Sequence, residues 1–349
     1  MLKRQFIQSV IGLVFLVTSS FAFSNTQFTY NVIQDGIEVT GCVDECPSDL
    51  VISEEIDGYS VISIRGSAFY QIGLNALILP NTLQYIGERA FERNYLTTLA
   101  IPSSVIEIGR NAFDFNQLVE VIIPDGVFYI GEDAFADNQL TTLTIPDSVE
   151  IIGDGAFDFN KLTSLTIPDS ISYLGEYVFA ENQLTTVTIP NSVTSIGDGA
   201  FSANQLTTLT IPGSVTSIGA EAFKNNQLTS IFLAEGIQII EDKAFANNLL
   251  TSVSIPSSVF NLRREAFSGN TGVIGGEWRY IERLGDAMLL GCADSCPSDM
   301  IIPEYIDGFH VQSIDDEAFS EEGLNSIRFP DGIVHIGQNA FLGNPLTGV

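Results

Sequence analysis

The sequence has 349 residues, of which 45% are apolar, so it is long enough to bury a sizeable core. Its 43 acidic residues outnumber its 14 basic residues and give a formal net charge of -29. A surface this acidic repels nucleic-acid phosphates and anionic lipid head groups, so we exclude nucleic acids and acidic membranes as partners.

The first residues, 1–24, predict a secretory signal peptide. Two cations at positions 3 and 4 precede an apolar run over 6–17, which is too short to span a bilayer. Ser20 and Ala22 then supply small side chains at a cleavage position. No later stretch is long and apolar enough for a membrane helix. We therefore expect a protein that is secreted or displayed at the cell surface.

The four cysteines form two close pairs, Cys42 with Cys46 and Cys292 with Cys296. In an exported protein such pairs predict two local disulfides. Each would stabilise the fold by roughly 2 kcal/mol in the loop-entropy description. A zinc site is the alternative, but zinc favours C-x2-C knuckles and four ligands, and no histidine lies near either pair. We favour the disulfides.

A repeat of 22 residues runs through the middle of the chain. Phenylalanine recurs at positions 69, 91, 113, 135, 157, 179, 201, 223, 245 and 267. Asparagine recurs at positions 94, 116, 138, 160, 182, 204, 226, 248 and 270. A register kept over ten units predicts a repeat architecture in which each unit is one turn of chain, here called a coil.

One coil contains a short strand. Leu143 and Ile145 alternate with Thr142 and Thr144, which is the period of a strand with one buried face. Pro146 lacks a backbone donor and ends this strand.

The remainder of the same coil returns to the core. We expect Gly153 to allow a sharp bend and Phe157 to lie inside on an irregular or 3₁₀ segment. The amide of Asn138 is expected to bond backbone groups of neighbouring coils.

These features predict a repeat solenoid. A single coil buries too little apolar surface to offset the entropy of ordering 22 residues, so coils must stack. We expect a right-handed stack of the leucine-rich-repeat type, with a parallel β-sheet on one face and short irregular or 3₁₀ segments on the other.

The unit LTxLxIPxSVxxIGxxAFxxN resembles the bacterial BspA-like leucine-rich repeat family over about 50–270 and again over 300–349. It departs from the commoner pattern L-x-x-L-x-L-x-x-N by its proline after the strand and its asparagine before it. The resemblance implies a curved solenoid with a secreted or surface-exposed binding role, because relatives include adhesins that bind host matrix proteins or other cells.

A longer duplication has an offset of 250 residues, since GCVDECPSDL at 41–50 matches GCADSCPSDM at 291–300. We predict a disulfide-bearing cap plus a ten-coil solenoid over 25–274, then a second cap and the start of a second solenoid over 275–349, with a linker at 268–276. The second unit has two repeat phenylalanines. A fragment, a truncated gene, or an open edge that associates with another copy would each explain this; we favour a fragment or truncation.

Catalytic motifs are missing from the sequence. There is no G-x-S-x-G, H-E-x-x-H, P-loop or G-x-G-x-x-G, and the first unit has no histidine to serve a nucleophile. We expect no enzyme activity, cofactor or metal, although the many carboxylates leave a glycosidase as a minor alternative. A calcium row is the alternative for one acidic register, which we interpret as a solvated turn: Glu88, Glu132, Asp154, Glu176, Asp198 and Asp242.

The solvent side of the strands carries two rows of side chains in which hydroxyl groups dominate the centre. Our candidate ligand-binding residues are Thr142, Thr144, Ser164, Thr166, Thr186, Thr188, Thr208 and Thr210. We expect an unknown protein or glycan ligand on a host or neighbouring-cell surface. β-Propensity alone would also explain the row. A self-associating surface-layer component or an ice-binding array would fit the same pattern of hydroxyl groups.

Overall fold

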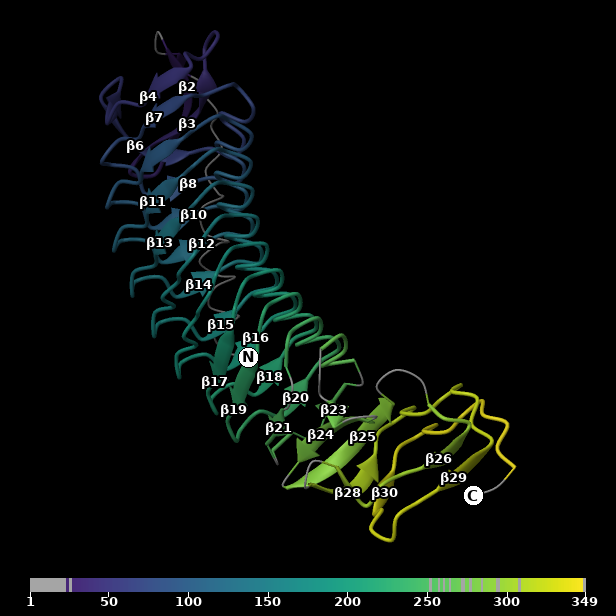
Figure 1. Ribbon diagram of the computed structural model, residues 1–349. Coiled ribbons are helices and arrows are strands. Elements are labelled where there is room, and N and C mark those ends of the chain that lie inside the picture. Colours follow the sequence, from purple (N-terminus) through teal and green to yellow (C-terminus); the bar gives the residue numbers. More distant parts are fainter. Residues whose placement is uncertain are drawn as a thin grey trace.

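The computed structural model describes residues 23–24, 27–250, 253–256, 258–259, 261–263, 265–270, 274–275, 278–283, 285–292, 296–306 and 309–347. The chain forms a gently curved rod of stacked coils, and a shorter set of coils follows at its C-terminal end (Figure 1). Every regular element among the described residues is a β-strand. Apart from β1 (Phe23–Ser24), which pairs with the next strand, the expected signal peptide lies outside the described residues.

The predicted strands form a parallel ladder along one side of the rod, which we call the strand face. Coils 22 residues apart pair in register, as Val121 does with Leu143. The hydrogen-bonded groups are β4–β7, β9–β11–β13 and β17–β19. The strands of this face are β4 (Asp49–Val51), β7 (Ala76–Ile78), β9 (Thr98–Ala100), β11 (Glu120–Ile122), β13 (Thr142–Thr144), β17 (Thr208–Ile211), β19 (Ser230–Leu233) and β21 (Ser254–Ile255).

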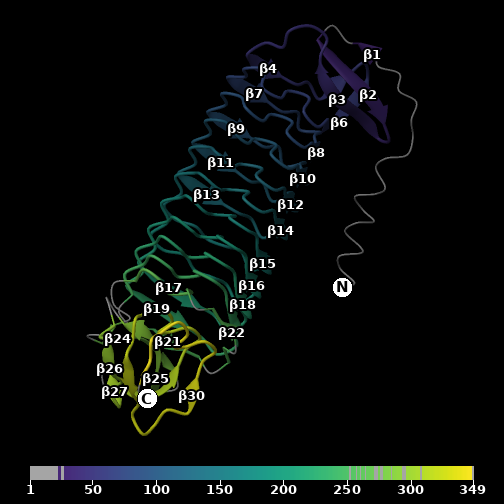
Figure 2. The same cartoon turned by 90° about the vertical axis from the view of Figure 1, so that its right-hand side faces the viewer.

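A second parallel ladder, which the repeat pattern did not reveal, occupies the other side of each coil (Figure 2). It stands where we expected an irregular or 3₁₀ segment. Two residues suffice for each strand because identical coils above and below complete the pairing. Its members are β8 (Tyr85–Ile86), β10 (Glu107–Ile108), β12 (Tyr129–Ile130), β14 (Ile151–Ile152), β15 (Tyr173–Leu174), β16 (Ser195–Ile196), β18 (Ser217–Ile218), β20 (Ile239–Ile240) and β22 (Asn261–Leu262).

The repeat phenylalanines form one buried stack, as the spacing predicted. Neighbouring rings from Phe69 to Phe267 lie 5.3–5.8 Å apart between centroids and are nearly parallel, with interplanar angles of 4–24°. Such offset stacking adds to the area that each ring buries. The core therefore runs along the rod as a continuous spine.

The repeat asparagines hold successive coils together from inside. Asn182 is 6% exposed, and its Oδ1 accepts a hydrogen bond from Leu162 N (2.9 Å) in the preceding coil. Its Nδ2 donates to Phe157 O (2.9 Å) in that coil and to Ala180 O (2.9 Å) in its own. The predicted amide bridge is thus confirmed, although it reaches the preceding coil rather than both neighbours.

The repeat glycine has a different role from the bend that we expected. A methyl group on Gly153 would overlap Glu132 N and Gly131 C of the preceding coil. The backbone at Gly153 is not left-handed, so the coils need glycine here for close approach and not for a turn. Left-handed residues instead sit two and six positions further on, at Gly155 and Phe159.

A hairpin covers the N-terminal end of the phenylalanine stack. It consists of β2 (Phe28–Ile33) and β3 (Gly36–Cys42), and Phe28 packs edge-on against Phe69 at 6.5 Å. The strand β3 continues into β6 (Tyr59–Ile64) by parallel pairing, and β5 (Glu55–Ile56) pairs antiparallel with β6. The disulfide Cys42–Cys46 closes this region with a Cα–Cα distance of 5.5 Å.

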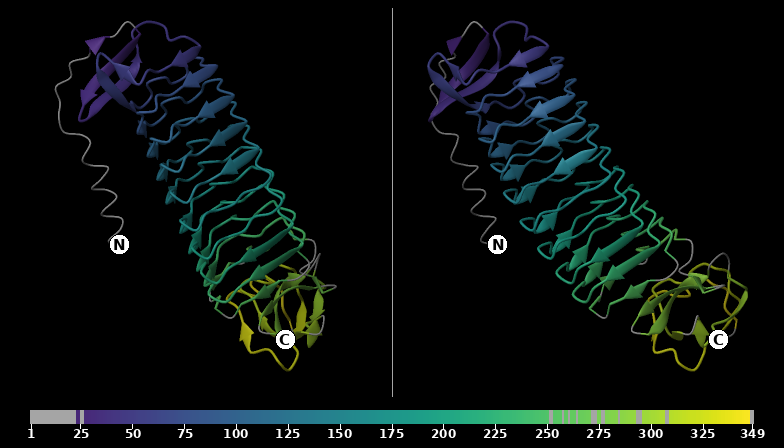
Figure 3. Two further views of the ribbon diagram at one scale, coloured as in Figure 1. Left: turned by 90° about the vertical axis from the view of Figure 1, so that its left-hand side faces the viewer. Right: turned by 60° about the vertical axis from the view of Figure 1, so that its left-hand side comes forward.

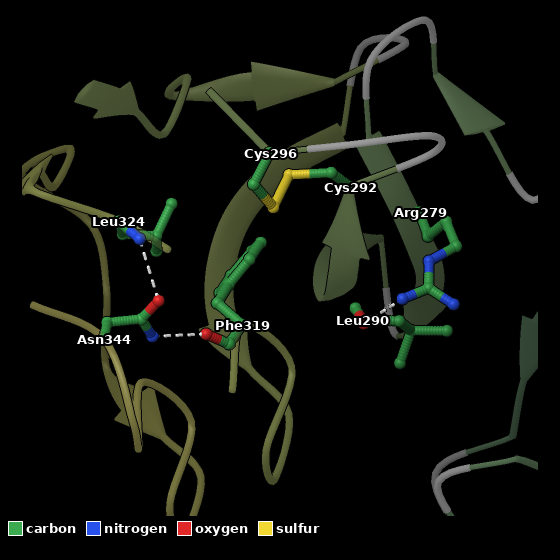
Figure 4. The surroundings of a disulfide bond; sticks show 7 residues. All are labelled: Arg279, Leu290, Cys292, Cys296, Phe319, Leu324 and Asn344. Carbon is green, nitrogen blue, oxygen red and sulfur yellow. Dashed lines mark hydrogen bonds between the residues drawn. A yellow bond between two sulfur atoms is a disulfide. The ribbon is translucent and has the colours of Figure 1, made fainter. Parts of the chain in front are cut away.

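The same arrangement recurs after the first stack. The second hairpin consists of β24 (Trp278–Arg283) and β25 (Asp286–Cys292), with β23 (Ile274–Gly275) beside β24. The disulfide Cys292–Cys296 lies near Phe319, whose carbonyl accepts a hydrogen bond from Asn344 (Figure 4). The elements that follow are β26 (Asp299–Ile301), β27 (Tyr305–Ile306), β28 (Phe309–Ile314), β29 (Ser326–Arg328) and β30 (His335–Ile336).

Candidate functional site

The eight candidate ligand-binding residues all lie on the strand face with exposed side chains. The pairs Thr142 with Thr144 and Thr208 with Thr210 point outward from β13 and β17, because Leu143 and Leu209 between them are buried. Ser164, Thr166, Thr186 and Thr188 lie in the two coils between these strands. The chain thus presents one row of hydroxyl groups over four coils.

Exposed aliphatic side chains extend this row toward the N-terminal end. Val51, Ile78 and Ile122 are 51%, 61% and 67% exposed, and they occupy the same outward register as Thr144. Val51 pairs with Ile78 in the ladder, and Ile122 pairs with Thr144. Aliphatic groups lined up in water are costly, and a large exposed apolar patch is typical of a protein-binding surface.

A groove lies at the other end of the hydroxyl row. It has a volume of about 560 Å³ and is open to solvent, with Phe232 (62% exposed) at one border. Its polar lining comes from Thr186, Thr188, Asn191, Thr208, Thr210 and Ser230. Hydroxyl groups and one exposed ring therefore share a concave part of the strand face.

The groove begins where the strand ladder is loosest. Between β13 and β17 the ladder is reduced to the single bridge Thr166–Thr188. The backbone bonds Thr185 N to Thr163 O and Thr207 N to Thr185 O are both 3.4 Å long, whereas Thr229 N to Thr207 O is 2.9 Å. The smaller Val187, which is only half-buried, fills the core position that Leu209 fills in the next coil. The hydroxyl array is consequently not a regular lattice, which disfavours an ice-binding surface.

The acidic register that raised the possibility of calcium has a backbone role in the structure. Asp154 Oδ1 accepts a hydrogen bond from Glu176 N, and Asp198 Oδ1 accepts one from Ala220 N, both at 2.7 Å. Each carboxylate thus bonds the turn of the following coil. Within the part of the chain that the structure describes, no three His, Cys, Asp or Glu side chains gather closely enough to hold a metal ion.

Two other carboxyl groups on the turn side have strongly shifted proton affinity. Burial raises the pKa of Asp114 and of Asp158 to about 7. Asp114 is 5% exposed; Asn111 Nδ2 donates to its Oδ2, while its Oδ1 is buried without a hydrogen-bond partner. These groups lie away from the strand face, so they do not form part of the candidate site.

Sequence reasoning found the hydroxyl row but missed its two ends. Val51 and Ile78 belong to longer, irregular coils outside the 22-residue register, so they did not align with the rows. Phe232 was visible as a flanking residue, but the groove beside it depends on how neighbouring coils separate. No periodic pattern reports that separation.

Comparisons with known proteins identify the repeat. The model of the family described as "BspA type Leucine rich repeat region" matches six copies over residues 51–162, 150–274 and 299–349. None of the curated proteins matches this sequence. Among the described residues, no helix is long and apolar enough to cross a membrane.

Several solved structures resemble the fold. A leucine-rich repeat protein from Bacteroides ovatus ATCC 8483 is 24% identical with a TM-score of 0.55, covering 93% of this chain and 92% of that one. A leucine rich cell surface protein from Faecalibacterium prausnitzii A2-165 is 20% identical (TM-score 0.31; 95% and 76% covered). The pneumococcal vaccine antigen PcpA is 15% identical (TM-score 0.36; 93% and 88% covered). The first of these supports a shared fold.

Proposed function

Because the chain belongs to the BspA-type leucine-rich repeat family, we propose that it is an exported, non-enzymatic adhesion protein that binds a protein ligand through its strand face. The observation that carries this proposal is the line of exposed aliphatic side chains at Val51, Ile78 and Ile122, which continues into the threonine pairs. These residues contribute nothing to the core, so their exposure calls for another reason.

A protein ligand fits this surface better than a glycan. Glycan sites rely on aromatic platforms with converging polar groups, whereas the N-terminal half of this face is aliphatic. An extended or flat protein surface can cover aliphatic side chains over several coils and bond the hydroxyl groups beyond them. Repulsion from the net charge of -29 favours a ligand that is neutral or basic.

The test is direct binding of the purified chain to a panel of matrix and cell-surface proteins and to a glycan array. We expect the double variant Ile78→Glu, Ile122→Glu to weaken binding of a protein ligand at least about tenfold, since buried apolar contacts dominate such interfaces. The quadruple variant with Lys at Thr144, Thr166, Thr188 and Thr210 should weaken it as well.

The control variant is Tyr173→Ala, because Tyr173 is 47% exposed on the second ladder instead of the strand face. It should leave affinity unchanged. Undiminished binding by both strand-face variants would remove the site from this face. Retention of glycans alone, with sensitivity to Phe232→Ala, would replace the protein ligand with a carbohydrate in the groove.

Self-association is the competing role, and it has a separate readout. Light scattering across a concentration series should show a monomer if the strand face serves another molecule. A mass that rises with concentration would instead favour a surface-layer component.

A further inference from the structure

The two hairpins occupy equivalent positions but have opposite outer faces. In the first hairpin the outward cross-strand pairs are polar: Asn31 Nδ2 donates to Glu38 Oε2 (3.2 Å), and Thr40 Oγ1 donates to Thr29 Oγ1 (2.8 Å). In the second hairpin, 250 residues later, Ile281 and Met288 take the places of Asn31 and Glu38 and pair in the same register. Leu290 takes the place of Thr40.

The apolar outer face is buried against the end of the first stack. Ile281 is 2% exposed and Met288 9% exposed, and both belong to the core of the first stack. Trp278, Tyr280 and Leu289, on the opposite face of the same hairpin, belong to the separate core of the second stack. The hairpin therefore serves two cores at once.

The end of the first stack is complementary to this face. Phe267, the last ring of the spine, is only 6% exposed although no further ring stacks beyond it among the described residues. β21 of the strand face pairs in parallel with β24, and the Arg283 guanidinium donates to Val259 O (2.6 Å). Apolar contact and edge pairing thus act together.

The pairing also sets the direction of the second stack. β25 pairs with β28, and β28 pairs with β30, as β3, β6 and β8 do in the first unit. The strand face of the first stack therefore continues into the second-ladder side of the next one. The C-terminal coils are accordingly turned out of line with the first stack (Figure 3).

We propose that the outer face of β24–β25 is a docking surface for the C-terminal end of a coil stack, with Ile281, Met288 and Leu290 as its specificity-determining residues. This chain's two units, 25–274 and 275–349, are then joined as one rigid body. The polar version of the same three positions, in the first hairpin, makes a water-facing end plate that accepts no stack.

The test is the full-length double variant Ile281→Asn, Met288→Glu, which installs the residues of the first hairpin. We expect a larger radius of gyration in X-ray scattering and at least about tenfold faster proteolysis within 268–277, because undocking exposes that segment. The matched control Asn31→Ala, Glu38→Ala changes the equivalent pair on the water-facing hairpin and should change neither measurement. Wild-type scattering and proteolysis in the double variant would overturn the proposal.

Trp278 distinguishes undocking from unfolding. It is the single tryptophan of the chain and packs edge-on against Phe319 (6.2 Å) inside the second stack. Undocking should leave its fluorescence emission close to that of the wild type. If the emission moves to that of unfolded chain, the milder Met288→Ala should still accelerate proteolysis with native emission, and a failure to do so would equally contradict docking.

Discussion

The turn side and the strand face of each coil follow opposite rules. On the turn side, phenylalanine, asparagine and glycine recur because each contacts its own counterpart or the backbone one coil away. On the strand face the outward residues change from aliphatic to hydroxyl to aromatic along the rod. Repetition thus marks positions that hold coils together, and variation marks positions that are free to serve a ligand.

The largest contrast should come from two phenylalanines in one coil. Phe157 is fully buried between Phe135 and Phe179, whereas Phe159 is 53% exposed. We expect Phe157→Ala to lower the free energy of unfolding by about 3–5 kcal/mol, because it opens a cavity inside the spine. Phe159→Ala should cost about 0.5 kcal/mol or less. Equal shifts in urea unfolding would contradict the distinction.

The asparagine bridge is next in expected effect. Asn182→Ala leaves Leu162 N and the carbonyls of Phe157 and Ala180 without their buried partner. We expect a loss of about 2–4 kcal/mol, since unsatisfied buried groups carry their full desolvation cost. Gln183→Ala, at the neighbouring exposed position, is the control for thermal unfolding. A loss no greater than that control would show that water replaces the amide.

Glycine at the close-approach position should have a smaller effect. Gly153→Ala must push apart two coils to fit its methyl group, for a cost of about 1–3 kcal/mol. Glu241 stands at the same register in a later coil and already has a Cβ. Glu241→Ala should therefore be nearly neutral in the same denaturation series, apart from its exposed ion pair with Arg263 (3.1 Å). A neutral Gly153→Ala would mean that the coils adjust freely.

The smallest expected effect depends on pH. Because burial raises the pKa of Asp114 from 3.8 to about 7, the folded chain retains a proton that the unfolded chain loses. Stability from this group is complete below pH 4 and falls as the pH rises toward 7. Asp114→Asn should thus stabilise the fold by about 1 kcal/mol at pH 8 and hardly at pH 4.

The control for charge is Asp147→Asn, which removes the same charge from an exposed turn. Urea unfolding at both pH values would separate the local effect from relief of the overall negative charge. A gain at pH 8 that is equal in the two variants would assign it to net charge alone.

Much of this architecture follows from the sequence by itself. A residue such as Phe157 meets its counterparts 22 positions away in either direction, so the period alone determines the spine, the asparagine bridges and the outward direction of Thr144. The disulfides were also predictable, because the two cysteines of each pair stand only 4 positions apart. All of these contacts repeat locally.

Only the tertiary structure decided what happens where the repetition weakens. The loosened ladder and the groove beside Phe232 depend on how Val187 packs against its neighbours, and side-chain volume does not appear in a periodic pattern. The burial of Ile281 and Met288 depends on a stack end formed by residues far along the chain. Two apolar faces on one hairpin were legible in the sequence, but the partner for the second face exists only after the coils have stacked.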